Sequence, residues 1–150
     1  MKLIRKGEGQ HRFQLTPREK DLLLNVLQLY PRVPSGYQPL TRSTGREEDK
    51  QRLLDEALTE TRLENQKELQ RLLSDAQRLR QQEGQWQLTL APVDLEWLLQ
   101  VLNDIRIGSW IHLGSPATPL KALTAQTAPD LWAMEMAGSF QMRFLELLEG

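Results

Sequence analysis

The sequence contains no cysteine, no excess of either charge and no long apolar run, and each absence excludes a class of protein. Without cysteine there is no disulfide framework, no thiolate nucleophile and no zinc ribbon. No apolar stretch approaches the roughly 18 residues of a membrane-spanning helix, and the basic first residues lack the apolar stretch of a signal peptide. The formal net charge of −1 favours neither a nucleic-acid binder nor a protein that docks on acidic surfaces. These features predict a cytoplasmic protein that has no membrane partner, and they disfavour a nucleic-acid partner.

The overall composition is that of an ordinary globular domain. The 150 residues are 39% hydrophobic and 26% charged, which predicts a single domain over residues 1–150. A chain of this length buries enough surface to fold without a metal ion. Neither Gly7-Glu8-Gly9 nor Gly114-Ser115 has the glycine spacing of a phosphate-binding loop. The sequence therefore predicts no catalytic residue, no metal site and no cofactor, and an enzyme is disfavoured.

One stretch of the sequence occurs twice, 75 positions apart. When residues 15–28 are aligned with residues 90–103, six of the fourteen positions are identical and four more are exchanges of like residues. In both copies a short alternating segment leads through a proline into a leucine-rich helix. This pattern predicts two pseudo-repeated strand–helix–loop–helix halves, about 1–75 and 76–150, in a mainly helical α+β fold.

Local signals place the other elements. Residues 2–5 and 11–15 flank a glycine-rich turn and predict a hairpin, to which residues 86–90 add a third strand of a small antiparallel sheet. Thr16 and Glu19 form a capping box around Pro17, so a helix begins there and ends near residue 29. Helices are also predicted from 92 to about 111 and from 129 to about 148. Residues 31–46 are rich in proline and glycine and predict a long loop.

Residues 47–82 contain no glycine or proline and predict a long charged helix. An unbroken helix here would be about 54 Å long, whereas a chain of this size has a radius of gyration of about 15 Å. The helix must therefore protrude, break near residues 61–65, or lie against a second subunit. Its apolar stripe, together with the length, predicts a candidate homodimer or partner interface formed by Leu54, Leu58, Leu69, Leu72 and Leu79.

The helix predicted from residue 92 is apolar almost all round, so it should lie at the centre of the core. Polar groups buried in such a helix must be paired. We therefore expect a buried polar cluster of Asn103, Asp104, Arg106 and Glu135, with Arg106 paired to Glu135 or to Asp104. The alternative reading is that Arg106 anchors a ligand in a pocket near Trp97, Trp110 and His112.

A family resemblance comes from the same helix. The sequence Trp97-Leu98-Leu99-Gln100-Val101-Leu102-Asn103-Asp104-Ile105-Arg106, followed by Gly108 and by His112-Leu113-Gly114, resembles the central motif of a bacterial protein family of unknown function. Its members are short, mainly helical, and often encoded beside the adaptor of the Clp protease. The resemblance implies a helical fold and a bacterial cytoplasm, and it implies no activity.

Together these observations favour a non-enzymatic interaction or regulatory protein that acts as a homodimer, or with a protein partner, through the helix 47–82. The alternative function is a small-ligand-binding or enzymatic domain that uses the pocket near Trp97, Trp110 and Arg106.

Overall fold

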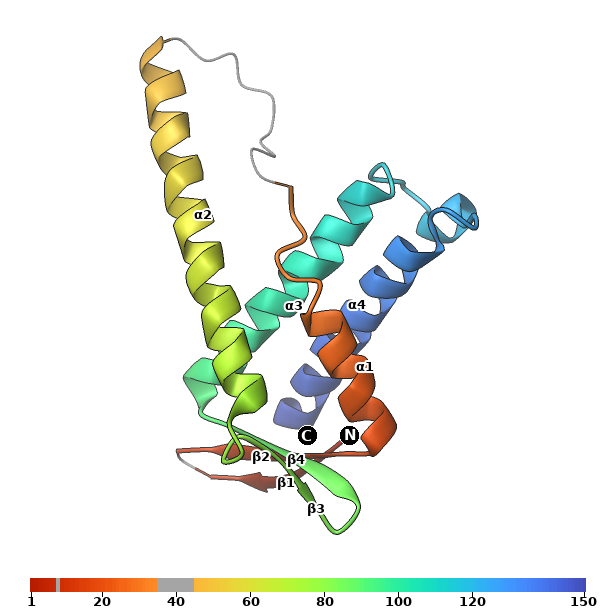
Figure 1. Ribbon diagram of the computed structural model, residues 1–150. Coiled ribbons are helices and arrows are strands. Elements are labelled where there is room, and N and C mark those ends of the chain that lie inside the picture. Colours follow the sequence, from red (N-terminus) through yellow and green to blue (C-terminus); the bar gives the residue numbers. More distant parts are fainter. Residues whose placement is uncertain (8, 35–44) are drawn as a thin grey trace.

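The computed structural model of the protein consists of a four-stranded antiparallel sheet with helices on one of its faces (Figure 1). The structure describes residues 1–7, 9–34 and 45–150, the last range with side chains from residue 48 on. Most of the predicted loop 31–46, and Glu8 of the predicted turn, lie outside the described residues. The predicted α+β class is confirmed, because the described residues form four α-helices and one antiparallel sheet.

The sheet joins two hairpins in the order β1-β2-β4-β3. Strands β1 (Lys2–Lys6) and β2 (His11–Leu15) form the predicted hairpin, and β4 (Gln85–Leu90) pairs with β2 as the predicted further strand. The fourth strand, β3 (Leu79–Gln82), was predicted to be helical, and that prediction is wrong. Glu83 and Gly84 connect β3 to β4 with φ angles of 53° and 78°, the left-handed conformation that a tight hairpin turn requires.

Helix α2 (Gly45–Ser74) is shorter than the predicted helix 47–82. It ends where the Asp75 carboxylate accepts a hydrogen bond from the Gln77 amide at 2.9 Å, a local turn that competes with helix. The helix is unbroken through residues 61–65 and is about 45 Å long for its 30 residues. Its N-terminal half stands away from the other helices (Figure 1), so within the single chain the helix protrudes and does not break.

The other helices begin and end close to their predicted bounds. Helix α1 (Pro17–Leu27) begins at the predicted capping box, in which Thr16 Oγ1 accepts the Glu19 amide at 3.1 Å and Glu19 Oε1 accepts the Thr16 amide at 3.0 Å. Helices α3 (Pro92–His112) and α4 (Ala128–Glu149) run antiparallel beside each other (Figure 1), and the short 3-10 helix η1 (Pro119–Ala122) lies between them in the chain.

The core lies between the helices and the inner face of the sheet and draws on both halves of the chain. Phe13 of β2 meets Phe144 of α4 edge-on, with ring centroids 5.0 Å apart. Each half consists of a hairpin, a helix, a connection and a second helix, although the duplication of one half from the other stays a prediction. The buried side chains that the two copies share are Leu15 with Leu90, Leu23 with Leu98, Val26 with Val101, and Leu27 with Leu102.

Candidate functional site

The groove between α3 and α4 has a volume of about 850 Å³ and a mostly apolar lining. Both helices carry more apolar residues than one core-facing stripe needs, so apolar side chains remain on their outer side. Met142 is 63% exposed and Leu145 is 46% exposed. The groove is lined by Arg106, Ile107 and Trp110 of α3, Pro119 of η1, and Met134, Glu135, Gly138, Ser139, Gln141, Met142 and Leu145 of α4.

Arg106 crosses the groove from α3 to α4. Its Nε donates to Gln141 Oε1 at 3.1 Å, and a terminal nitrogen donates to Asn103 Oδ1 at 3.0 Å. A Cβ atom at Gly138 would lie 3.3 Å from Arg106 Cδ, so the glycine makes room for the arginine stem. Both partners of the guanidinium are neutral, and no carboxylate of a described residue forms an ion pair with it. The site therefore holds an oriented positive charge beside apolar side chains.

The predicted buried polar cluster is not buried, and the predicted pairing of Arg106 is wrong. Asn103, Arg106 and Glu135 are exposed, and Asp104 is half-buried. The reason is the helical period: Leu98, Leu102 and Ile105 occupy the core-facing side of α3, which leaves Asn103 and Arg106 on its outer side. The prediction assumed that a mostly apolar helix is buried on every side.

Asp104, Gly108 and His112 lie four residues apart on α3 and form a seat for the segment that follows α1. The Asp104 carboxylate accepts the Arg32 amide at 2.7 Å and the Val33 amide at 3.3 Å. His112 Nε2 lies 3.2 Å from the Arg32 carbonyl oxygen, and the Arg32 guanidinium pairs with Asp130 of α4. A Cβ atom at Gly108 would overlap the backbone of residues 32 and 33. This glycine permits a close approach of the chain rather than of a second helix.

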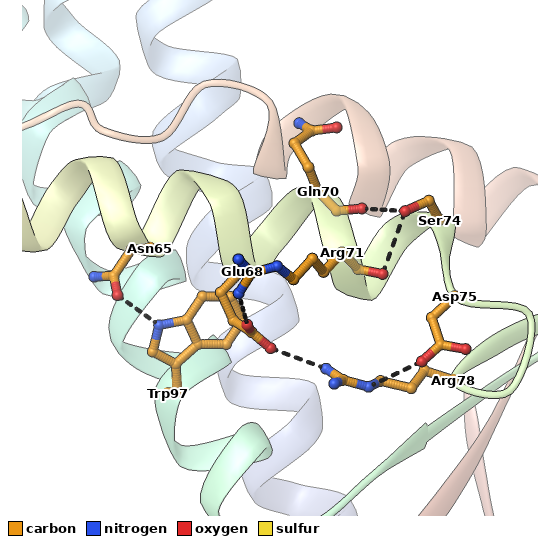
Figure 2. Close-up of polar contacts among 8 residues, drawn as sticks. All are labelled: Asn65, Glu68, Gln70, Arg71, Ser74, Asp75, Arg78 and Trp97. Carbon is orange, nitrogen blue, oxygen red and sulfur yellow. Dashed lines mark hydrogen bonds and ion pairs between the residues drawn. The ribbon is translucent and has the colours of Figure 1, made fainter.

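Trp97 faces α2 and takes no part in the groove. Asn65 of α2 accepts a hydrogen bond from the Trp97 indole at 3.0 Å and donates one to the Tyr30 hydroxyl at 3.0 Å. Figure 2 shows the contact between Asn65 and Trp97 and, beside it, Glu68 between two arginine side chains, Arg71 and Arg78. The predicted pocket of Trp97, Trp110 and His112 is therefore not formed, because the three side chains have different surroundings.

The structure divides the predicted interface residues of the long helix. Leu69 and Leu72 are buried on the same molecule's core, and Leu79 is buried in β3, so none of the three is available to a partner. Leu54 and Leu58 continue the same helical stripe into the protruding half of α2, where they are 57% and 48% exposed. Only this outer part of the predicted interface is a surface.

Of the groove residues on α4, sequence reasoning singled out Glu135 and missed the apolar ones as a site. The signal is present in the sequence, since Met134, Met142 and Leu145 are apolar residues beyond those that one stripe requires. The contacts of Arg32 with Asp104 and Asp130 had no sequence signal, because they join positions 72 and 98 residues apart.

Comparison with protein-family models, with curated proteins and with solved structures gave no match. None of the helices in the described ranges is both long and apolar enough to cross a membrane. Among the described side chains, no three His, Asp or Glu residues are grouped so that they could hold a metal ion.

Proposed function

We propose that the protein is a non-enzymatic interaction protein that binds an acidic amphipathic helix of a partner protein in the groove between α3 and α4. The observation that carries the proposal is Arg106, which is oriented by Asn103 and Gln141 and has no carboxylate partner among the described residues. An arginine held by neutral groups keeps its full charge and its planar donors for a carboxylate of the ligand.

The shape of the groove supports a helix as the ligand. Two antiparallel helices form its sides, and exposed Met142 and Leu145 form part of its lining, so it is open along its length. A pocket for a small molecule instead encloses most of its ligand. Methionine side chains adapt to different apolar partners, and grooves of this kind receive the apolar face of an amphipathic helix.

A peptide selection tests the proposal. A displayed library of helical peptides is selected on the wild-type chain and on Arg106→Glu, with Arg52→Glu on the exposed side of α2 as a control of equal charge change. We expect the wild type and the control to enrich peptides with Asp or Glu three or four residues from apolar anchors. Arg106→Glu should enrich Lys or Arg at that position. Peptides that are the same on all three proteins would contradict the role of Arg106.

The affinity of one selected peptide then measures the two parts of the site separately. Arg106→Gln should weaken binding about 10-fold, as expected for loss of one charge-assisted hydrogen bond. Met142→Ser should weaken it through the apolar contact without a change of charge, and because Met142 is exposed the fold should be unaffected. If the selection enriches no peptide and the protein instead binds a small aromatic carboxylate, the alternative function as a ligand-binding domain is favoured.

Self-association through the protruding half of α2 is a second candidate function, supported by the exposure of Leu53, Leu54 and Leu58. Residues 45–64 carry seven acidic and four basic side chains, so two copies would repel each other. A homodimer should therefore strengthen as salt screens the repulsion. Sedimentation of the wild type at low and high salt tests this, with the double variant Leu54→Ser/Leu58→Ser as the monomeric control. A wild type that is monomeric at both salt concentrations would exclude the dimer. We also propose that the protein acts in the cytoplasm of a bacterium, and this part of the proposal is supported by the sequence features and the family resemblance alone.

A further inference from the structure

The sheet has one face covered by helices and one open face (Figure 1). Successive side chains of a strand point to opposite faces. On β2 the inward positions are His11, Phe13 and Leu15, all buried, so Arg12 and Gln14 lie on the open face. This open face is a different surface from the groove between α3 and α4.

A β-bulge brings a second arginine to the same place. Leu3 is opposite Phe13, but the next pair is Arg5 opposite Arg12, which leaves Ile4 as the extra residue of β1. Strict alternation would place Arg5 on the inner face with Leu3. The extra residue turns it to the open face, and redirecting a side chain in this way is a common use of bulges at functional sites.

The two arginines have no partner in the described part of the chain. Neither guanidinium forms an ion pair or a hydrogen bond with a described residue, and the Nε of Arg12 is buried without a partner. Like charges directly opposite each other destabilise a sheet, and a buried donor without a partner destabilises the fold further. A bound anion would relieve both effects at once.

A polar pocket of about 450 Å³ surrounds this arginine pair. Its lining consists of Arg5, Gly7, Gly9, Gln10, Arg12 and Thr89. Thr89 of β4 is the cross-strand neighbour of Arg12 on the other side, so Arg5, Arg12 and Thr89 form one row across three strands. The row supplies two cations and a hydroxyl group.

We propose that this pocket binds a small phosphorylated molecule, with its phosphate group between Arg5 and Arg12. Planar guanidinium groups match the oxygen atoms of a phosphate in pairs, and two arginines match the charge of a phosphomonoester dianion. The volume suits a small molecule. A single-stranded nucleic acid would need aromatic side chains on which its bases stack, and none of the described lining residues is aromatic.

The test is a titration of the full chain, followed by backbone amide shifts at constant ionic strength. The probes are inorganic phosphate and glycerol phosphate, with chloride as the background anion. We expect saturable binding with the largest shifts at Gly7, Gly9, Arg12 and Thr89. Arg5→Gln and Arg12→Gln should each weaken it about 10-fold. No saturation, or equal effects of phosphate and chloride, would overturn the proposal.

Arg80→Gln is the matched control. Arg80 lies on the same open face, but its guanidinium is already bonded to Gln82 at 3.2 Å and to Gln87 at 3.5 Å, and it is outside the pocket. It should leave phosphate affinity within about 2-fold, the effect of a distant surface charge. If Arg80→Gln weakens binding as much as Arg12→Gln does, the sheet attracts anions diffusely and the pocket assignment is wrong.

Two further arms separate the sources of the phosphate group. Phosphatidylcholine vesicles that contain phosphatidic acid present it on a membrane, and a short DNA duplex presents it on a nucleic acid. The proposal is supported if the protein binds soluble glycerol phosphate and binds neither the vesicles nor the duplex. Tighter binding to the vesicles or to the duplex than to glycerol phosphate overturns the small-molecule assignment.

Thermal unfolding without phosphate shows whether Arg12 is needed for the fold, and unfolding with phosphate shows whether the anion binds the folded protein. Without phosphate, Arg12→Gln should be at least as stable as the wild type, because it removes a like-charge contact. Phosphate should raise the Tm of the wild type more than that of Arg12→Gln, because the variant binds it about 10-fold more weakly. A large drop in the Tm of Arg12→Gln without phosphate would mean that Arg12 is structural, and this would overturn the proposal.

Discussion

The helices of the two halves differ in how they meet the rest of the molecule. In the second half, α3 and α4 lie side by side and form a groove (Figure 1). In the first half, only the C-terminal part of α2 lies against the rest of the molecule, and its N-terminal half protrudes (Figure 1). All of these helices are long, so length does not decide the outcome. The difference lies in the apolar surface: α3 has buried residues from Leu95 to Ser109, whereas from residue 48 on the buried residues of α2 are Leu69 and Leu72.

It follows that local sequence determined that α2 is a helix, and the extent of its apolar stripe determined where it is attached. A charged helix of this kind is held by a few contacts near one end. Those contacts include the leucines of the stripe, the bridge from Asn65 to Trp97 and Tyr30, and the hydrogen bond from Gln66 to the Tyr30 carbonyl oxygen at 3.4 Å.

The largest effect is expected within the leucine stripe of α2. Leu72→Ala should lower the free energy of unfolding by about 2–5 kcal/mol, because the side chain is 1% exposed and its removal leaves a cavity. Leu58→Ala, on the same stripe of the same helix, should change it by less than about 0.5 kcal/mol. Urea denaturation of both variants measures the difference, and equal losses would mean that the outer half of α2 is packed in solution.

The second prediction compares two glycines inside the paired helices. Gly108→Ala should cost about 1–3 kcal/mol, because its methyl group meets the backbone of residues 32 and 33, which must shift. Gly138→Ala meets only the flexible stem of Arg106 at 3.3 Å and gains helix propensity. Its stability should be unchanged or higher.

Thermal denaturation of these two variants is the measurement. Gly138→Ala should also weaken binding in the groove, since it displaces Arg106 from Gln141 and Asn103. A destabilised Gly138→Ala beside an unaffected Gly108→Ala would contradict the seat that we describe for Arg32.

The contrast between the halves also shows what the sequence could predict. The capping box at Thr16, the start of α3 at Pro92 and the first hairpin follow from local rules and were predicted. The end of α2 was not predicted, because Leu79 keeps the helical spacing of the stripe although it pairs with β4 in the sheet. Tertiary pairing overrides local propensity at such a position.

The site was harder to predict than the fold. Arg106 was singled out, but burial was assumed from the apolar character of α3, and the helical period places the side chain outside. Its true partners, Asn103 and Gln141, include one from the neighbouring helix at a separation of 35 residues. A single sequence contains no signal for a contact of that kind.

The third prediction concerns the bridge that attaches α2. Asn65→Ala leaves the Trp97 indole and the Tyr30 hydroxyl without their shared partner, and this should cost about 1–3 kcal/mol. Glu64→Ala, an exposed neighbour on the same helix, is the control and should change stability by less than about 0.5 kcal/mol. Equal stability of the two variants, in urea denaturation, would show that the leucines alone hold α2.

The smallest effect is a pH dependence at the same bridge. Burial raises the pKa of Tyr30 above its ordinary value of 10.0, and the Asp104 carboxylate adds to the rise, while the hydrogen bond from Asn65 opposes it. The folded state therefore holds the hydroxyl proton more tightly than the unfolded state does. The resulting stability is fully present below about pH 10 and is lost as the pH rises through the pKa of the folded state.

Tyr30→Phe isolates this contribution from the other groups that titrate in alkali. The variant has no hydroxyl proton at position 30, so its unfolding free energy should fall less steeply above pH 10 than that of the wild type. Parallel curves would mean that Tyr30 is as accessible to water when folded as when unfolded, and then the attachment of α2 to the body would be looser than the contacts of Asn65 indicate.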